Sequence, residues 1–266
     1  MRKIGFLRLR WLLTGQFGFA PRVMWNSLRE LPRYVSNWYR FRRHYIGPMR
    51  FAPCLHDRNE EGGSTKSEYF WQDLLVARWI FAANPTRHVD IGSRVDGFVA
   101  HVASFRNIEV FDIRPTDYAG PGIVFMQADV MQSEALMKIP PDYCDSLSCL
   151  HALEHFGLGR YGDPIDPLGY QKGLSNMIAF LKQGGTFYLS IPIGQERVEF
   201  NAFRVFDPFE IIQLTKAQGL ICNLLTVISQ NAAVEHGPIS PERLKTLSNS
   251  EYNLGIFVFT KLLENL

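Results

Sequence analysis

The sequence predicts an α/β fold, in which a doubly wound, mostly parallel sheet of seven strands follows a basic helical extension. Three observations support this. A strand, a tight turn and a helix start share residues 88–98, HVDIGSRVDGF. A second apolar run ends in polar residues at 145–156, DSLSCLHALEHF. Short apolar runs and helical periodicity alternate along the rest of the chain, which is typical of parallel sheets covered by helices.

Seven apolar runs have the length of strands. They lie at residues 89–91, 108–111, 123–126, 145–150, 186–191, 221–228 and 255–261. Helical periodicity is found at residues 69–83, 98–105, 170–181 and 208–218. The first helix ends at Asn84-Pro85, because proline cannot continue a helix, and Gly184-Gly185 turns the chain into the fifth strand. In such a sheet, ligands bind at the carboxyl ends of the strands.

Size and composition fit one folded domain with an appendage. The chain has 266 residues, 46% of them hydrophobic, which is enough to bury a substantial core. We expect an extension and linker at 1–60 and the α/β domain at 61–266. The four cysteines lack CxxC spacing, so they predict reduced thiols in the cytoplasm and not a zinc site. No run reaches the roughly 18 apolar residues of a membrane span.

The first fifty residues are strongly basic and aromatic. They hold eleven Lys and Arg against one acid, Glu30, although the net charge of the whole chain is only +2. Such a composition suits a helix at a lipid surface, and therefore peripheral membrane contact through residues 1–50. It also suits helices that pack their aromatic face on the α/β core and leave arginine in solvent. Nucleic acid is a weaker alternative, because no base-reading motif is present.

The turn after the first strand is the first candidate binding element. Gly92 and Ser93 lie between the strand and a helix start, where backbone N–H groups can hold a phosphate or carboxylate. Asp112 ends the second strand about twenty residues later, a position from which a carboxylate accepts hydrogen bonds from a ribose diol. Together these signals predict an adenosine-type cofactor.

At these motifs the chain resembles class I S-adenosylmethionine-dependent methyltransferases, and more closely the domain of unknown function 268 family. The resemblance covers about residues 70–262 and rests on DIGSRVDGF, DSLSCLHALEHFGLGRYGDPIDPLGY and FLKQGGTFYLSIPIG. It implies a Rossmann-like sheet with S-adenosyl-L-methionine as cofactor. The residues then expected at the cofactor are Asp90, Gly92, Ser93 and Gly97 around the first turn, Asp112 at the ribose, Asp129 at the adenine, and Ser148 and Leu150 in the fourth strand.

The first turn departs from the methyltransferase pattern. That pattern has glycine two and four positions after Gly92, but this chain has Arg94 and Asp96 there, with Gly97 one position late. A bulky side chain where the backbone must approach a ligand would reshape or block the pocket.

Candidate catalytic residues lie directly after the fourth strand. Methyl transfer needs a base only when the acceptor loses a proton, as a sugar hydroxyl does. His155 is the first candidate because imidazole titrates near neutral pH, and Glu154 or His151 can orient or replace it. A histidine here can instead cap a backbone carbonyl, and this structural role is expected more for His151.

A polar loop at 157–170 is expected to bind the acceptor. Arg160, Tyr161 and Asp163 can hydrogen-bond a polyhydroxylated ligand, or can simply shape a turn. Asp163 and Asp166 each precede a proline, a step that favours turns, so no metal site is expected.

A second polar loop at 199–208 is expected to close over the same pocket. It places Asn201 and Arg204 among three phenylalanines. Arg204 can clamp a phosphate or carboxylate of the acceptor, or can pair with Glu199 or Asp207.

The leading hypothesis for function is methyl transfer to a small molecule or glycan, in the biosynthesis of a surface polysaccharide or glycolipid. The alternative is a non-catalytic module that keeps the fold and binds a membrane or a protein partner, an idea that Arg94 and Asp96 support. Oxidoreduction with NAD is disfavoured, because GSRVDG lacks the GxGxxG arrangement.

Overall fold

The computed structural model describes residues 12–55, 63–117, 120–132 and 139–263. By its internal contacts the chain forms two units, Met1–Ser64 and Thr65–Leu266. Each unit is described by itself.

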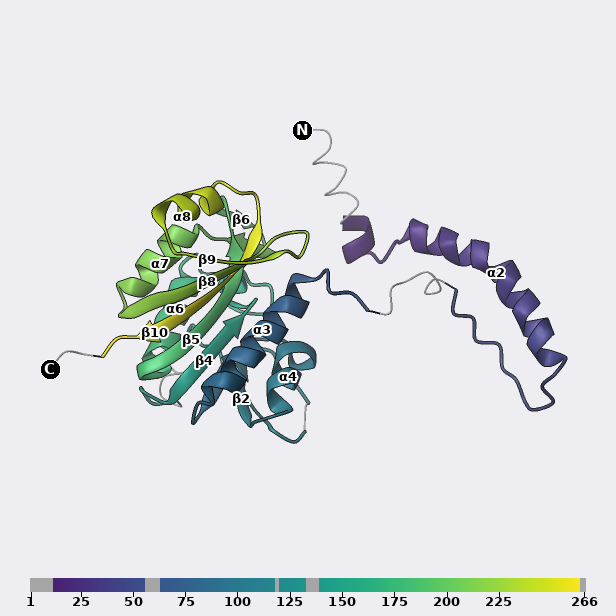
Figure 1. Cartoon of the computed structure of the whole chain (residues 1–266), viewed down its shortest axis with the longest axis horizontal. Coiled ribbons are helices and arrows are strands. Elements are labelled where there is room, and N and C mark those ends of the chain that lie inside the picture. Colours follow the sequence, from purple (N-terminus) through teal and green to yellow (C-terminus); the bar gives the residue numbers. More distant parts are fainter. Residues whose placement is uncertain (1–11, 56–62, 118–119, 133–138, 264–266) are drawn as a thin grey trace. The chain divides into compact units, whose positions relative to one another are not determined.

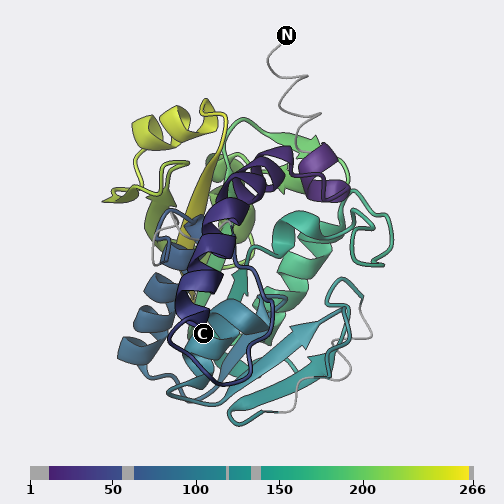
Figure 2. The ribbon, with the colours of Figure 1, turned by 90° about the vertical axis from the view of Figure 1, so that its right-hand side faces the viewer.

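The first unit is mainly one long helix. A π-helical turn at Leu12–Gln16 precedes α2, Pro21–Arg42, which starts on a proline and is continuous in both views (Figure 1, Figure 2). None of the 22 residues of α2 is buried. The chain after the helix folds back on it, where the ring of Phe51 packs against Tyr34 and Trp38 at centroid distances of 5.0 and 5.8 Å.

The second unit is built on a sheet of eight strands in the order β3-β2-β1-β4-β5-β10-β8-β9 (Figure 1). The strands are β1 His88–Ile91, β2 Ile108–Asp112, β3 Ile123–Gln127, β4 Cys144–Leu150, β5 Leu181–Ile193, β8 Leu220–Ile228, β9 Val234–Gly237 and β10 Asn253–Lys261. Five neighbouring strands, β3-β2-β1-β4-β5, are parallel. β10 is antiparallel to both β5 and β8. The predicted doubly wound, mostly parallel sheet is thus confirmed.

The sheet differs from the prediction at one edge. β9 is an eighth strand, paired antiparallel with β8. An edge strand is only partly buried and can therefore be short and polar, as the sequence VEHG is. It lacks the apolar run that marks a central strand, which is why it was not predicted. A separate hairpin of β6, Arg197–Glu199, and β7, Phe203–Val205, also lies where a loop was expected.

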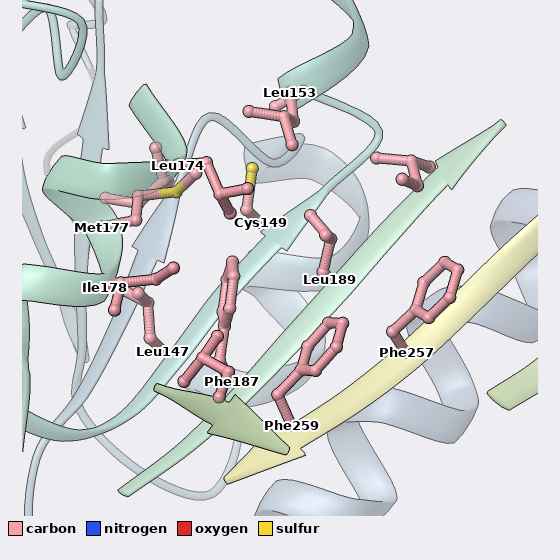
Figure 3. Packing of buried hydrophobic residues seen from close by; sticks show 14 of the residues in the cluster. Leu147, Cys149, Leu153, Leu174, Met177, Ile178, Phe187, Leu189, Phe257 and Phe259 are labelled. Carbon is pink, nitrogen blue, oxygen red and sulfur yellow. The ribbon is translucent and has the colours of Figure 1, made fainter. Parts of the chain in front are cut away.

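Helices cover the two faces of the sheet. One core cluster joins α3 (Glu68–Ala83) and α4 (Ala100–Ala103) to the sheet through Val76, Ile80 and Val102. The other joins α6 (Gly169–Phe180), α7 (Pro208–Lys216) and α8 (Pro241–Ser248) to the opposite face. Figure 3 shows Leu174, Met177 and Ile178 of this second cluster facing side chains of the strands.

Local sequence explains where the helix nearest the site begins and ends. Ser67 accepts a hydrogen bond from the backbone N–H of Tyr69 at the start of α3, as an N-cap does. The helix ends at Asn84, which adopts a left-handed conformation just before Pro85. Within the described parts of the chain, no helix is long and apolar enough to cross a membrane.

Candidate functional site

A cavity of about 410 Å³ lies at the carboxyl ends of β1, β2 and β4. Its lining comes from the loops after these strands, from the start of α3 and from Tyr252 beside β10. This is the edge where open α/β sheets bind ligands, and the volume lies in the usual range for small-molecule sites. The cavity therefore defines the candidate site.

Gly92 shapes the floor of the cavity. It follows β1 with a φ of +72°, a conformation that side chains rarely adopt, and a Cβ there would lie 2.9 Å from the Cβ of Ala152. Only glycine therefore lets the segment after β4 approach this turn. Gly92 lines the cavity, as predicted for a cofactor-binding turn.

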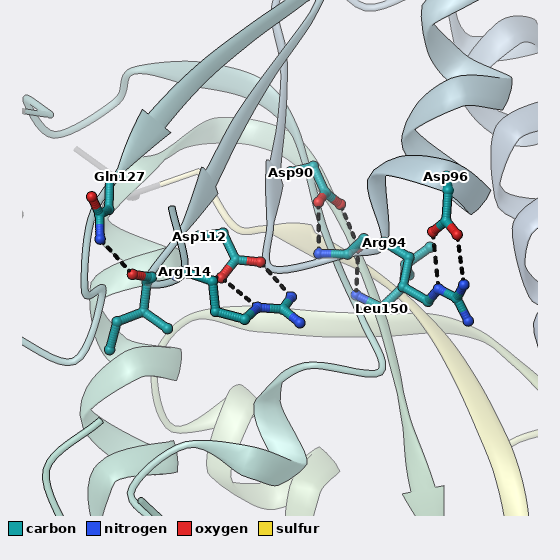
Figure 4. A network of polar contacts seen from close by, with 9 residues as sticks. Asp90, Arg94, Asp96, Asp112, Arg114, Gln127 and Leu150 are labelled. Atoms are coloured by element: carbon teal, nitrogen blue, oxygen red, sulfur yellow. Dashed lines mark hydrogen bonds and ion pairs between the residues drawn. The ribbon is translucent and has the colours of Figure 1, made fainter. Parts of the chain in front are cut away.

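Asp90 lies beneath this turn and not in the cavity. Its carboxylate accepts hydrogen bonds from the N–H of Ser93 at 3.0 Å and from the hydroxyls of Ser93 and Ser148 at 2.7 and 2.5 Å. Figure 4 shows Asp90 and its bonds to the turn that precedes Arg94. Burial raises the pKa of Asp90 to about 7. The sequence interpretation placed Asp90, Ser93 and Ser148 at the cofactor, but none of them lines the cavity. Their observed contacts hold the turn in place from below.

Leu150 and Gly97 also lie outside the cavity lining. The N–H of Leu150 donates to the hydroxyl of Ser93, and its side chain is buried in the core on the α3 side of the sheet. A Cβ on Gly97 would lie 2.8 Å from Oδ2 of Asp73 on α3, so this glycine permits helix packing. We therefore reassign both residues from cofactor contact to support.

Arg94 and Asp96 point away from the floor of the site. Their side chains form an ion pair, Nη2 to Oδ2 at 2.7 Å, and are 63% and 73% exposed (Figure 4). The Arg94 residue borders the cavity without filling it. The departure from the glycine pattern therefore leaves room for a ligand, because the two side chains pair with each other at the surface.

Asp112 lines the cavity, and its carboxylate is bound by Arg114. The N–H of Arg114 donates to Oδ1 at 2.8 Å, Nε donates to Oδ1 at 3.0 Å, and Nη2 donates to Oδ2 at 2.5 Å (Figure 4). The same guanidinium lies 4.5 Å from the ring centroid of Tyr161. Oδ2 accepts only one of these bonds and so keeps a lone pair for a ribose hydroxyl, but a ribose diol gains full access to Asp112 only where the Arg114 side chain turns aside.

Asp129 lines the cavity beyond the end of β3. Its Oδ1 accepts from the N–H of Met131 at 2.9 Å, and its Oδ2 accepts from the side-chain amide of Gln132 at 3.2 Å. These bonds fix the turn. Since each carboxylate oxygen can accept more than one hydrogen bond, the adenine amino group predicted for this position remains compatible with them.

His151 is held by α3. Its Nδ1 lies 2.7 Å from Oε1 of Gln72, its Nε2 lies 3.3 Å from Oε1 of Glu68, and its ring stacks on Tyr69 at 4.4 Å. Burial lowers the pKa of His151, but its interaction with the accepting carboxylate of Glu68 and the charges of Glu154 and Glu68 outweigh this and raise it. Because Nδ1 contacts Gln72 and the ring is stacked on Tyr69, His151 is fixed against α3. The geometry thus agrees with a structural role.

Glu154 is the most unusual side chain of the site. It is 1% exposed, and its Oε2 has no hydrogen-bond partner among the described residues. Burial raises its pKa to about 7, against the opposing charge of His151. A buried acceptor without a donor is costly, so such a group in a cavity indicates a bound ligand or a chemical role.

His155 lies next to Glu154, with Nε2 3.7 Å from Oε1. Its Nδ1 is 2.7 Å from the carbonyl oxygen of Ala202, which can only accept, so we assign the proton to Nδ1 and the free lone pair to Nε2. Burial and the charge of Arg160 lower the pKa of His155 to about 4. At neutral pH this ring is uncharged but weakly basic, so Glu154 is the stronger candidate base.

The loop after His155 contributes Arg160, Tyr161 and Asp163 to the cavity lining. Asp163 accepts from the N–H groups of Gly159 at 3.0 Å and Tyr161 at 3.1 Å, which fixes the loop. Nη1 of Arg160 donates to the carbonyl of Ala202 at 2.8 Å, and its guanidinium lies 5.1 Å from the Tyr161 ring centroid. Tyr161 is thus in contact with the guanidinium groups of Arg160 and Arg114.

Asn201 and Arg204 do not line the cavity. Asn201 is exposed, whereas Arg204 is 5% exposed and donates to backbone carbonyls, Phe156 at 2.5 Å and Pro167 at 3.4 Å. Its guanidinium also lies over the Tyr170 ring. The expectation that Arg204 clamps the acceptor, or pairs with Glu199 or Asp207, is corrected, because its donors are used inside the fold. Arg204 therefore anchors both ends of the segment from Phe156 to Pro167.

Sequence reasoning missed several lining residues. Tyr252 donates to Oε1 of Glu68 at 2.8 Å, so residues 184 positions apart meet at the mouth of the site. Tyr69 and Phe203 also line the cavity. No local motif marks these side chains, because only the tertiary fold brings α3 and the β10 edge together. Arg114 was missed as well, although its place two residues after Asp112 is a signal that could have marked it.

Residues 131–257 match the model of a family described as Caenorhabditis protein of unknown function, DUF268. No curated protein matches the chain by sequence.

Solved structures share the fold at low sequence identity. The crystal structure of the [4+2]-cyclase SpnF has a TM-score of 0.52 at 12% identity and covers 76% of this chain and 86% of its own. The 1,6-didemethyltoxoflavin-N1-methyltransferase of Burkholderia thailandensis, solved with 1,6-didemethyltoxoflavin and S-adenosylhomocysteine, has a TM-score of 0.51 at 15% identity and covers 92% of each chain. The sequence resemblance is thus confirmed: the chain has the fold of class I methyltransferases, and its second half matches DUF268.

Proposed function

We propose that the protein is an S-adenosylmethionine-dependent methyltransferase that acts on a small or carbohydrate-like acceptor. One observation carries the proposal: the buried Oε2 of Glu154 lacks a partner among the described residues, and Glu154 lines the same cavity as Gly92, Asp112 and Asp129. This cavity fits a ligand that brings a hydroxyl or amine proton to a residue able to accept it.

The residues of the cavity fit the proposed cofactor at three places. The Gly92 turn leaves space that a Cβ would fill, which suits close approach of a ligand to the backbone. Asp112 offers a carboxylate to the ribose hydroxyls, provided that Arg114 turns aside. Asp129 offers one to the adenine amino group.

When bound, S-adenosylmethionine supplies an electrophilic methyl group. Glu154, which lines the cavity, would then accept the proton that an acceptor hydroxyl or amine loses. A pKa of about 7 leaves a useful share of carboxylate at neutral pH, while the buried position keeps water from competing. The lone pair on Nε2 of His155 can orient the same acceptor by taking a hydrogen bond.

Polar residues around the cavity support the choice of acceptor. Arg160 and Tyr161 provide hydrogen-bond donors and a ring face, as sites for polyhydroxylated ligands do. We therefore favour a sugar of a surface polysaccharide or of a lipid-linked precursor. We place the reaction in the cytoplasm, where the thiols of Cys54, Cys144, Cys149 and Cys222, free in the structure, would stay reduced.

Calorimetric titration of the full chain with S-adenosylhomocysteine tests the cofactor. We expect saturable binding that Asp112→Asn weakens and that Glu210→Gln, an exposed acid on α7, leaves unchanged. The acceptor is then sought with radiolabelled S-adenosylmethionine and pools of nucleotide sugars and glycolipids, with Glu154→Gln as the inactive control. Cofactor binding that survives Asp112→Asn unchanged would refute the assigned site.

A non-catalytic binding module is the second candidate, and one contact favours it. Arg114 neutralises the carboxylate that the ribose requires, with three hydrogen bonds. The cyclase among the solved structures also indicates that this fold is compatible with chemistry other than methyl transfer. Absence of S-adenosylhomocysteine binding in both the natural chain and Arg114→Ala would favour this candidate.

A further inference from the structure

The long helix α2 has a row of arginines along one side. Arg22, Arg29, Arg33 and Arg40 are spaced by seven, four and seven residues, so they share one helical face. The helix holds five arginines and one acid, Glu30, which pairs with Arg33. Its surface is therefore strongly cationic along most of its length.

A second face of α2 is apolar and exposed. Met24, Leu28, Leu31 and Val35 follow one another at intervals of four, three and four residues, and their side chains are between 36% and 57% exposed. Trp25 and Tyr39 lie at the edge of this face that borders the arginine row, and they are 62% and 65% exposed. An apolar face of this size on a helix is normally covered by something.

Within its own unit, the segment that follows α2 covers a different part of the helix. Tyr34 and Trp38 pack against Phe51, and the hydroxyl of Tyr34 accepts a hydrogen bond from the N–H of Ala52 at 3.1 Å. The returning segment thus leaves Met24, Leu28 and their neighbours uncovered.

We propose that α2 lies in the interface of a membrane that contains anionic phospholipids. The apolar face enters the boundary of the acyl chains, Trp25 and Tyr39 lie at the headgroup level, and the arginines bind phosphates. Arginine suits this role because its planar guanidinium binds phosphate through two hydrogen bonds. The charged residues that run from Arg22 to Arg42 orient the helix along the surface and not across it.

The aliphatic side chains of the apolar face favour lipid over nucleic acid as the partner of α2. Single-stranded nucleic acid binds aromatic rings by stacking, but Met24, Leu28, Leu31 and Val35 have no ring to stack on. A nucleic acid would leave this aliphatic row in water, whereas lipid acyl chains cover it and phosphates neutralise the arginines beside it. The proposal is independent of the proposed methyl transfer.

Flotation of the full chain with lipid vesicles tests the proposal. We expect the protein to float with vesicles of phosphatidylcholine and phosphatidylglycerol, less at high salt, and poorly with phosphatidylcholine alone. The variant Arg22→Gln, Arg29→Gln, Arg33→Gln, Arg40→Gln should bind at least about tenfold more weakly. Met24→Ser with Leu28→Ser should also lose binding, because apolar insertion is required.

A matched control removes the same charge from the other unit: Arg78→Gln, Lys182→Gln, Lys216→Gln, Lys245→Gln, all at exposed positions. It should float like the natural chain. Brominated lipids should quench tryptophan fluorescence, and Trp25→Phe should reduce the quenching. The proposal is overturned if the folded protein fails to float, or if the control variant loses vesicle binding as much as the α2 variants do. It is also overturned if the chain prefers single-stranded RNA to vesicles, or if it forms a dimer that dissociates only in the α2 variants.

Discussion

Arg114 binds both carboxylate oxygens of Asp112, through Nε at 3.0 Å and Nη2 at 2.5 Å, at the position that we propose for the ribose of the cofactor. In the same position the guanidinium lies 4.5 Å from the ring centroid of Tyr161, which also lines the cavity, so two contacts hold it there. The pair therefore acts as an internal competitor for the cofactor, and its strength sets how readily Asp112 becomes available.

Removing this competitor should tighten cofactor binding. Arg114→Ala frees both oxygens of Asp112, and we expect the Kd for S-adenosylhomocysteine to fall by roughly tenfold, the size of a hydrogen bond to a charged group. Calorimetry provides the measurement. Arg160→Ala also removes a guanidinium from the Tyr161 ring, but Arg160 donates to the carbonyl of Ala202 and not to Asp112, so this variant should leave the Kd unchanged. Weaker binding in Arg114→Ala would instead assign this arginine to the ligand.

Glu154 should make stability fall as the pH rises. Its pKa is raised from 4.5 to about 7, so between these values the folded state holds more protons than the unfolded state. The stability associated with the neutral carboxyl is present below about pH 4.5 and is lost as the pH rises through about 7.

Glu154→Gln resembles the protonated acid and should remove this dependence. At pH 8 we expect the variant to exceed the natural chain in free energy of unfolding by about 1–3 kcal/mol, because the natural chain must bury a charge. At pH 5 the two should be nearly equal. Urea denaturation at both pH values measures this, and a difference of the same size at both would contradict the raised pKa.

Gly92 should tolerate no side chain. Gly92→Ala adds a Cβ at a φ of +72° and 2.9 Å from the Cβ of Ala152, so we expect a loss of about 2–3 kcal/mol in free energy of unfolding. Gly162→Ala is the matched control: its φ is +85°, but a Cβ there meets nothing within 4 Å. Thermal unfolding of both variants separates backbone strain from the clash. Equal losses of unfolding free energy in the two variants would show that the contact with Ala152 adds nothing to the backbone strain.

Arg204 should stabilise the loop that carries Arg160 and Tyr161. Arg204→Met keeps the stem but removes the donors to the carbonyls of Phe156 and Pro167, and we expect a loss of about 2–4 kcal/mol. Amide exchange should accelerate within residues 156–167. Arg160→Met, at an exposed position, should change stability by less than about 0.5 kcal/mol. Unchanged exchange in Arg204→Met would contradict an anchoring role.

The sequence determined the order of seven strands of the sheet and of α3, α6 and α7, and the polar ends of β1, β2 and β4, but not β6, β7, β9 or α8. Apolar periodicity marks buried elements directly, and the chain's own turn residues, such as Gly92 and Asn84, mark where they stop. Because parallel strands end at one edge, these local signals also predicted that Asp112, Glu154 and His155 would gather around one cavity.

The tertiary structure alone decided what each of these side chains can do. Asp90 and Arg204 carry the residue types of a binding site, yet burial and hydrogen bonds inside the fold direct them to support. Glu154 ranks above His155 as the base because desolvation raises the pKa of the first and lowers that of the second. A pattern of residues gives their order along the chain, but pKa and partners depend on burial and distance, which only packing determines.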